Sequence, residues 1–364
     1  MSRSVPMSTP AKARQHIRYV TAPDGTRLAW AESGAGPVLV KAANWLTHLE
    51  YEWESPVWRH WLHFFSAHCR FVRYDERGCG MSDWQDGVLS LEQWAGDLES
   101  VIDAARPDAP VTLLGISQGA STCIQYALGH PERVGRMILY GGYAQGWRRR
   151  GTAESQAVYK AVVDLMRVAW SKDNPAFRQT FTSRFIPGGT QEQLQWFNDL
   201  CLKTTPGEVA ARVQEARGDV DLTLELGRVR TPTLVLHARD DQVIPVAEGR
   251  RLASGIPGAE FVELDSRNHI LLEHEPAWRR FQDAVLAFLQ PGQSRRDSVF
   301  AALSARERQV LALMADGLSN IDIAECLDIS EKTVRNHASN LFDKLGVWSR
   351  ARAIAFARDH GFSG

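Results

Sequence analysis

Ser117 lies in the pentapeptide Gly115–Gly119, between an apolar run at Val111–Leu114 and an amphipathic run at Ala120–Leu128. A strand that leads directly into a helix must turn sharply, and glycines on both sides of a serine leave room for that turn. The turn raises the hydroxyl above the strand ends and directs the N-terminus of the helix toward it. The spacing predicts a nucleophilic serine, which needs a general base and an acid that orients the base.

Three more segments carry residues suited to this chemistry. Asp75–Ser82 reads DERGCGMS, Thr231–Pro245 reads TPTLVLHARDDQVIP, and Phe261–Glu275 reads FVELDSRNHILLEHE. Together with the serine turn, these motifs in this order resemble the α/β-hydrolase superfamily from about Gln15 to Leu289. The resemblance implies the chain order Ser, acid, His for a catalytic triad.

The resemblance implies that Ser117, Asp241 and His269 are the catalytic residues. In the family the acid follows three positions after a small residue that ends a strand, and Ala238 fills that position. This selects Asp241 over Asp240. His274 is expected at a helix start or on the surface, and the DERGCGMS loop is structural in relatives.

The oxyanion loop departs from the family pattern. One donor is expected to be the N–H of Gln118, directly after the nucleophile. In relatives the second donor is the N–H of the residue after a His-Gly pair that follows a strand. Here Ala43-Asn44 stands in place of that pair, after the predicted strand Val38–Ala42. The N–H of Trp45 is therefore the second candidate. Asn44 is expected to keep the turn, because Asn is the non-glycine residue that best tolerates a positive φ. Loss of the pair weakens the case for esterase-like turnover.

Two polar segments near this site have two interpretations each. His48 and Glu50 are either pocket-wall residues or ordinary residues of a helix start. Arg148-Arg149-Arg150 either attracts an anionic ligand at the entrance to the site or forms a solvated charged face.

The elements that must position these residues alternate between strand and helix. The hairpin-forming pair of strands is expected around the turn Pro23-Asp24-Gly25. Strands are predicted at His16–Thr21, Thr26–Glu32, Val38–Ala42, Arg70–Tyr74, Val111–Leu114, Met137–Tyr140, Thr233–His237 and Glu260–Leu264. Helices are predicted at Trp58–Ala67, Ser90–Ala105, Ala120–Leu128 and Ala277–Leu289. This order predicts an α/β fold with a mostly parallel sheet covered on both faces.

The segment from about 147 to 228 lacks strand signals, and its aromatic residues mostly follow helical spacing. A helical insertion here predicts a lid over the carboxyl ends of the strands, where open α/β sheets bind ligands. The alternative is a helical subdomain whose aromatic residues only pack on one another.

The C-terminal segment predicts four short helices. Ser304 with Glu307 and Ser319 with Asp322 form capping boxes for the first two, which end near Gly317 and Leu327. Ser330 caps a third helix that ends near Leu345 before Gly346, and Ser349 opens a fourth that runs to about Asp359.

Residues Leu303–Phe362, with the motifs SEKTVRNH and KLGVWSR, resemble the LuxR-type helix-turn-helix. The resemblance implies that the third helix enters the major groove of double-stranded DNA. Arg335 or Asn336 is expected to read bases, and Thr333 and Lys344 to contact phosphates. The expected DNA-binding set is Lys332, Thr333, Arg335, Asn336, His337, Asn340 and Lys344. The resemblance also implies a homodimer through the fourth helix.

Composition limits the remaining possibilities. The net charge is −1, and residues 298–364 contain eight basic and eight acidic residues, so any basic footprint on DNA must be local. The five cysteines are scattered without metal-ligand spacing, so neither a metal nor a cofactor is expected. The same scatter is typical of free thiols, so the protein is expected in a reducing cytoplasm. No apolar run suits a membrane span or a signal peptide.

The expected organisation is a tail at 1–14, a hydrolase-like domain at 15–290, a linker at 291–298 and a DNA-binding domain at 299–364. The leading hypothesis is a transcriptional regulator that senses a small organic ligand, such as an ester, lactone or acyl signal. The alternative is an active serine hydrolase whose DNA-binding domain regulates or localises it. A helical docking module without DNA binding is a further interpretation of the C-terminal segment.

Overall fold

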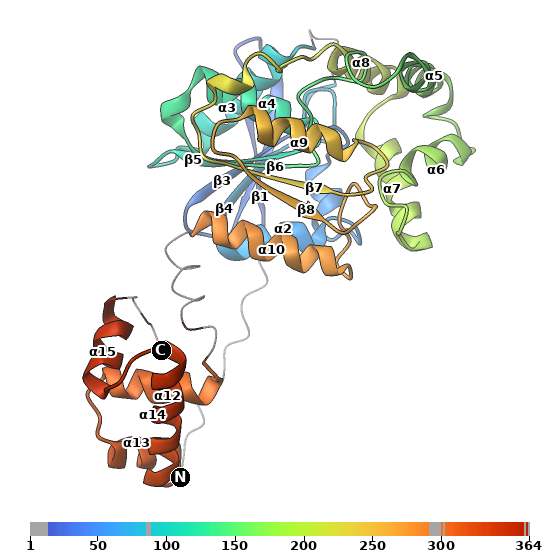
Figure 1. Cartoon of the computed structure of the whole chain (residues 1–364). Coiled ribbons are helices and arrows are strands. Elements are labelled where there is room, and N and C mark those ends of the chain that lie inside the picture. Colours follow the sequence, from blue (N-terminus) through green and yellow to red (C-terminus); the bar gives the residue numbers. More distant parts are fainter. Residues whose placement is uncertain (1–13, 85–88, 291–299, 301–302, 360–361, 363–364) are drawn as a thin grey trace. The chain divides into compact units, whose positions relative to one another are not determined.

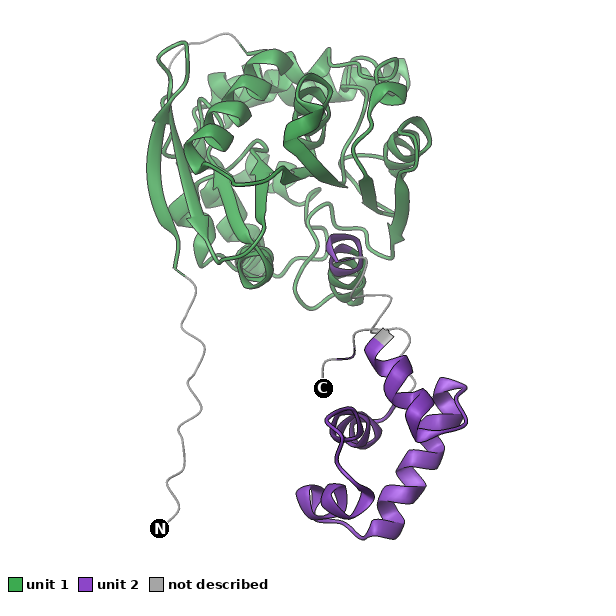
Figure 2. Cartoon of the chain, turned by 90° about the vertical axis from the view of Figure 1, so that its left-hand side faces the viewer, with its two compact units in different colours: residues 1–284 green, residues 285–364 purple. Residues whose placement is uncertain are grey.

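The computed structural model describes residues 14–84, 89–290, 300, 303–359 and 362 (Figure 1). The chain divides into two compact units, residues 1–284 and 285–364, so the division falls within α10 (Pro276–Leu289) (Figure 2). The linker expected at 291–298 and all but the last residue of the tail expected at 1–14 lie outside the described residues. The domain limits of the sequence analysis therefore stay predictions.

The first unit contains an eight-stranded sheet with the order β1-β2-β4-β3-β5-β6-β7-β8. The strands are β1 (His16–Thr21), β2 (Arg27–Ser33), β3 (Val38–Ala42), β4 (Arg70–Tyr74), β5 (Val111–Ile116), β6 (Val134–Tyr140), β7 (Thr233–Ala238) and β8 (Glu260–Leu264). The first two strands pair antiparallel to their neighbours, and the pairs from β4 to β8 are parallel. The predicted mostly parallel sheet is confirmed.

Helices cover both faces of this sheet (Figure 1). One face carries α3 (Leu91–Ala105), α4 (Gly119–Gly129) and α9 (Val246–Gly255), and the other carries α2 (Arg59–His68) and α10. Side chains of α2 and α10 pack directly, since the rings of Trp61 and Phe281 are 4.6 Å apart. Burial on both faces explains the nearly continuous apolar runs of the central strands.

Four helices lie between β6 and β7, in the segment where the sequence predicts a helical lid. They are α5 (Ala153–Ala169), α6 (Ala176–Thr182), α7 (Gln191–Thr204) and α8 (Gly207–Gly218). Thr152 and Thr190 start α5 and α7 with reciprocal capping boxes, because each side chain and the residue three positions later satisfy each other's backbone N–H groups. A short helix, α1 (Leu49–Trp53), follows β3, where the sequence analysis gave a helix start at His48 and Glu50 as one of two interpretations.

The second unit contains α12 (Ala305–Ala315), α13 (Asn320–Leu327), α14 (Glu331–Leu345) and α15 (Arg350–Asp359). Ser304, Ser319 and Ser330 cap the first three as predicted, and Gly346 ends α14 in the left-handed conformation. The core of this unit is apolar and includes Val310, Leu311, Ile323, Val334 and Leu341, all fully buried. The prediction of four short helices is confirmed.

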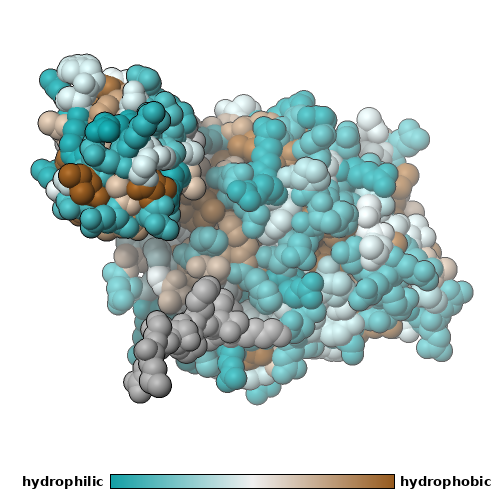
Figure 3. All heavy atoms as spheres, turned by 90° about the horizontal axis from the view of Figure 1, so that it is seen from below, coloured by the Kyte–Doolittle hydropathy of each residue, from teal (hydrophilic) through white to brown (hydrophobic). Residues whose placement is uncertain are grey.

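Hydrophilic side chains cover most of the surface visible in Figure 3, and apolar residues interrupt it in separate patches. Within the part of the chain that the structure describes, no helix combines the length and the apolar character needed to cross a membrane.

Candidate active site and DNA-binding helix

The turn that carries Ser117 has the strained backbone expected of a nucleophile. Ser117 has a φ of 53°, a left-handed conformation that is uncommon outside glycine. A Cβ atom on Gly115 would lie 2.6 Å from the Cα atom of Ala120, and one on Gly119 would lie 3.1 Å from the carbonyl oxygen of Ala42. The flanking glycines therefore allow α4 to start directly against the end of β5.

Asp241 and His269 meet although they come from separate loops. Nδ1 of His269 and Oδ2 of Asp241 are 2.6 Å apart. The other carboxylate oxygen, Oδ1, accepts hydrogen bonds from the N–H groups of Val243 and Ile244 at 2.7 and 2.9 Å. Asp240, the rejected candidate, is exposed. The geometry thus places Asp241 where an orienting acid must lie.

A second histidine, His237 on β7, lies against the same carboxylate and was missed by the sequence analysis. Its Nε2 atom donates to the carbonyl oxygen of Ile244 at 2.9 Å and lies 3.6 Å from Oδ2 of Asp241. Burial lowers the pKa of His237, although the charge of Asp241 opposes the shift. The only signal in the sequence is a polar residue at the penultimate position of an otherwise apolar strand.

The environment keeps Asp241 ionised. Burial raises the pKa of Asp241, but the charge and hydrogen bond of His269 and the charge of His237 outweigh burial, so the pKa falls below its ordinary value. An ionised Asp241 holds the proton of His269 on Nδ1 and leaves Nε2 as an acceptor, which is the tautomer a general base requires.

The nucleophile and the base are not hydrogen bonded in this conformation. Nε2 of His269 is buried and has no hydrogen-bond partner within the described residues. The Ser117 side chain is also largely buried, in a residue only 5% exposed. Hydrogen bonds between catalytic groups often shorten only when substrate binds, so the open acceptor on Nε2 remains compatible with base catalysis.

The two candidate oxyanion donors are available. Among the described residues, neither the N–H of Gln118 nor that of Trp45 donates a hydrogen bond. The expectation for Asn44 is wrong in one respect: the positive φ of this loop, 65°, belongs to Leu46 instead. Asn44 holds the loop through its side chain, which accepts from the ammonium group of Lys41 and donates to the carbonyl oxygen of Trp45 at 3.1 Å. A side-chain bridge from Lys41 through Asn44 to Trp45 therefore holds the loop.

Aromatic residues of the lid segment cover the base. The ring of Trp45 lies 5.4 Å from those of Trp170 and Phe181. Phe181 packs on Phe185, whose ring lies 5.5 Å from the imidazole of His269. The aromatic residues of the lid thus pack on the site as well as on one another, which favours the lid interpretation over an independent subdomain.

The DERGCGMS loop supports the site without supplying a reacting group. The carboxylate of Asp75 accepts from the N–H groups of Leu49 and Met81. Glu76 forms a buried ion pair of 2.7 Å with Arg217 of α8, so the loop also ties the lid to the core. The expected structural role agrees with these contacts.

The structure places the two polar segments that had two interpretations each, His48 with Glu50 and the arginine run 148–150, in different surroundings. His48 is the N-cap of α1 and accepts from the N–H of Tyr51 at 3.3 Å, and Glu50 is exposed, so the helix-start interpretation fits both. Within the arginine run, Arg148 pairs with Asp219 at 2.6 Å, Arg149 is exposed and Arg150 lines a pocket.

On α14, the predicted DNA-binding residues do not share one environment. Lys332, Asn336 and Asn340 are exposed, and Thr333 and His337 are half-buried. Val334 is buried in the core, as predicted.

Arg335 and Lys344 already have acidic partners. Arg335 pairs with Glu331 of the same helix at 2.7 Å. Lys344 binds both carboxylate oxygens of the buried Glu307 on α12, at 2.8 and 3.0 Å. The phosphate contact predicted for Lys344 would have to compete with this ion pair.

The fold and these sites define an α/β-hydrolase-fold protein with a C-terminal helix-turn-helix domain. Residues 61–276 match the family described as "Serine aminopeptidase, S33", and residues 301–357 match "Bacterial regulatory proteins, luxR family". The first match spans more than half of the chain. The chain belongs to the serine aminopeptidase S33 family and carries a LuxR-family DNA-binding domain at its C-terminal end.

Individual relatives resemble one part or the other. The AB hydrolase superfamily protein YisY of Bacillus subtilis is 28% identical over 203 residues, which cover 55% of this chain and 74% of YisY. The response regulator VraR of Staphylococcus aureus is 36% identical over 80 residues, 22% of this chain and 38% of VraR. The enol-lactonase from Burkholderia xenovorans LB400, known from a crystal structure, is 26% identical in sequence to this chain. Its structure superposes with a TM-score of 0.61, and the match covers 75% of this chain and 100% of the enzyme.

Proposed function

We propose that this protein is a transcriptional regulator that binds double-stranded DNA and senses a small organic ligand, an ester, lactone or acyl signal, through its hydrolase-like pocket. The observation that carries the proposal is the joining of a LuxR-family domain to a hydrolase fold in one chain. We further propose that it acts in the cytoplasm as a homodimer.

Three features support sensing at Ser117. Ser117 and Trp45 are buried, Trp45 packs on the lid residue Trp170, and the name of the enol-lactonase relative points to ester or lactone chemistry. Phe185 contacts His269 directly, so a ligand beside Ser117 must displace or reorder the lid. A ligand can change DNA affinity only if it binds one conformation of the protein more tightly than another. Reordering of the lid would supply two conformations that differ in ligand affinity.

A test needs the full-length protein, because the coupling joins two domains. A DNA site is first selected from a random library, and its Kd is measured by fluorescence anisotropy with and without γ-decanolactone or p-nitrophenyl butyrate. We expect at least one probe to change the Kd about fivefold or more, within the usual range of allosteric coupling. Trp45→Ala should abolish that change and leave the Kd without probe unaltered. A Kd that neither probe alters in the wild type, or a probe effect that persists in Trp45→Ala, would overturn the proposal.

The second candidate is an active serine hydrolase, and the Asp241–His269 hydrogen bond favours it specifically. It requires that the purified chain hydrolyse p-nitrophenyl butyrate and that Ser117→Ala abolish hydrolysis. Turnover that survives in Ser117→Ala would come from a contaminant, and its absence in the wild type would exclude activity on this ester. The two candidates are compatible if slow hydrolysis ends the signal.

A further inference from the structure

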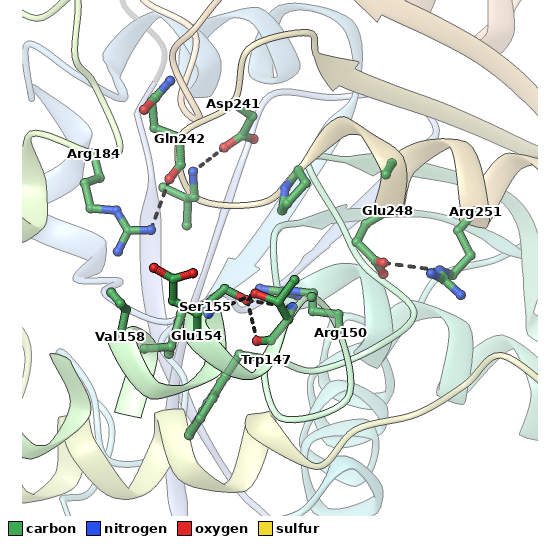
Figure 4. A pocket seen from close by; sticks show the side chains of 16 residues that line it. Trp147, Arg150, Glu154, Ser155, Val158, Arg184, Asp241, Gln242, Glu248 and Arg251 are labelled. Carbon is green, nitrogen blue, oxygen red and sulfur yellow. Dashed lines mark hydrogen bonds and ion pairs between the residues drawn. The ribbon is translucent and has the colours of Figure 1, made fainter. Parts of the chain in front are cut away.

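A second pocket, of about 600 Å³, reaches the triad from the side of its acid (Figure 4). One wall belongs to the start of the lid, residues 147–159, with Arg184 from the segment between α6 and α7. The other wall is the loop after β7 and the first turns of α9, residues 241–251. Of the three candidate triad residues, only Asp241 lines this pocket.

Two guanidinium groups in this pocket lack an acidic partner. Arg150 donates to the carbonyl oxygen of Gln145 at 2.9 Å and lies over the ring of Tyr143 at 4.5 Å. Arg184 donates to the carbonyl oxygen of Gln242 at 3.1 Å. Neither forms an ion pair within the described residues, although both are partly buried. Arginine that is partly desolvated and still has free donors suits a carboxylate ligand.

The acidic groups in the pocket do not cancel this charge. Glu248 is paired with Arg251 at 3.2 Å. Both oxygens of Asp241 accept hydrogen bonds, from Val243 and Ile244 on one side and His269 on the other. Glu154, on the first turn of α5, is exposed and forms no ion pair within the described part of the chain. Among the described residues, the lining groups without an ion pair or a hydrogen-bonded partner for their charge are thus Arg150, Arg184 and Glu154, while the charge of Asp241 is held by His269 and two backbone N–H groups.

The same pocket has an apolar wall. The rings of Trp147 and Tyr159 stack 5.1 Å apart with an interplanar angle of 15°. Val158 also lines the pocket and is 59% exposed, although most valines in folded proteins are buried. Such a surface gains free energy when an apolar ligand covers it.

We propose that this pocket binds an organic carboxylate with an apolar body. The carboxylate faces Arg150 and Arg184, and the body covers Val158 and the half-buried Tyr159. Because its walls belong to both the lid and the acid loop, an occupant holds the lid against the core. The inference does not rest on the proposed function, since the pocket binds an acid whether or not the protein controls transcription.

Calorimetric titration of the full-length protein tests the chemistry directly. The probe is phenylacetate, and phenylacetamide is its uncharged match. We expect phenylacetate to bind at one site and phenylacetamide to bind at least about tenfold more weakly, because hydrogen bonds to a charged group are the stronger ones. Equal binding of the two probes, or no binding of phenylacetate, would overturn the proposal.

Three substitutions and one control locate the site. Arg150→Gln and Arg184→Gln should each weaken phenylacetate binding about tenfold, and Arg149→Gln, which removes the same charge one residue away, should leave it unchanged. Glu154→Gln should tighten phenylacetate binding, because it removes a negative charge from the pocket. Misfolding would weaken binding, so it could not produce this gain. Equal losses in Arg149→Gln and Arg150→Gln, or no gain in Glu154→Gln, would contradict the site. A result here does not depend on DNA binding, so it is separable from a failure of the proposed sensing function.

Discussion

The side chains of Asp241 and His269 are buried, and hydrogen bonds hold Asp241 on both of its oxygens, whereas Lys332, Asn336 and Asn340 of α14 are exposed. The triad residues come from three separate loops, and Ser117 lies more than a hundred positions before Asp241, so only the sheet can bring them together. The α14 residues come from one helix and share a surface by helical periodicity alone. A buried site thus depends on the whole fold, and an exposed reading surface depends on one helix and its packing.

The largest expected effect tests the buried side of this comparison. Asp241→Asn should slow the reaction of Ser117 with a fluorophosphonate probe by about 10⁴-fold, because the amide stabilises the wrong imidazole tautomer. Labelling rates followed by mass spectrometry measure the effect. Asp240→Asn is the matched control on the neighbouring exposed residue and should react within about twofold of the wild type. Equal slowing by both variants would remove Asp241 from its assigned position.

A smaller effect is expected at the exposed helix. Asn336→Ala should weaken binding to a selected DNA site by about 1–3 kcal/mol if Asn336 reads a base. Fluorescence anisotropy of the labelled DNA gives the Kd. Gln309→Ala, an exposed residue of α12, should leave the Kd unchanged. A matching loss in Gln309→Ala would mean that the effect does not arise on α14.

The ion pair of Glu307 and Lys344 lies between the two extremes, because the carboxylate is buried and the ammonium group is exposed. Burial raises the pKa of Glu307, but hydrogen bonds from Lys344 and Ser304 outweigh it and lower the pKa. Its contribution to stability is therefore present above the ordinary pKa of a glutamate, about 4.3, and is lost as the pH falls through the lower folded value.

Glu307→Gln should reduce the free energy of unfolding by about 1 kcal/mol at neutral pH, and by less in acid. Urea denaturation at pH 7 and near pH 3 measures the loss of unfolding free energy at each pH. Glu325→Gln, an exposed residue of α13, is the control. A loss of the same size at both pH values would show that the carboxylate charge has no part in it.

The smallest effect belongs to the exposed pair of Glu331 and Arg335. Glu331→Gln should change the free energy of unfolding by no more than about 0.5 kcal/mol, because exposed ion pairs contribute little. It should tighten DNA binding, since it releases Arg335 and removes a negative charge near the phosphates. A weaker complex in Glu331→Gln would argue that Glu331 itself contacts DNA.

Much of the fold was predictable, because periodicity and capping residues carry strong local signals. His16–Thr21 and Glu260–Leu264 were predicted with their observed limits. α9 was not predicted, since its sequence VAEGRRLASG contains two glycines and few apolar residues. Within the oxyanion loop, the residue types pointed to Asn44 for the positive φ, but packing assigns it to Leu46. Local preference is weak where a buried polar bridge such as Lys41–Asn44 holds the chain.

The sequence by itself determined the two families, the order of the serine, acid and histidine motifs, and the helix on which the DNA-reading residues are predicted. These are properties of contiguous segments, whose residue types and spacing reflect local backbone geometry. Only the tertiary structure decided which charges are paired: Lys344 meets Glu307, while Arg150 and Arg184 meet no carboxylate within the described residues. Partners 37 positions apart, as in the Lys344–Glu307 pair, are chosen by packing, and no local pattern in the chain encodes that choice.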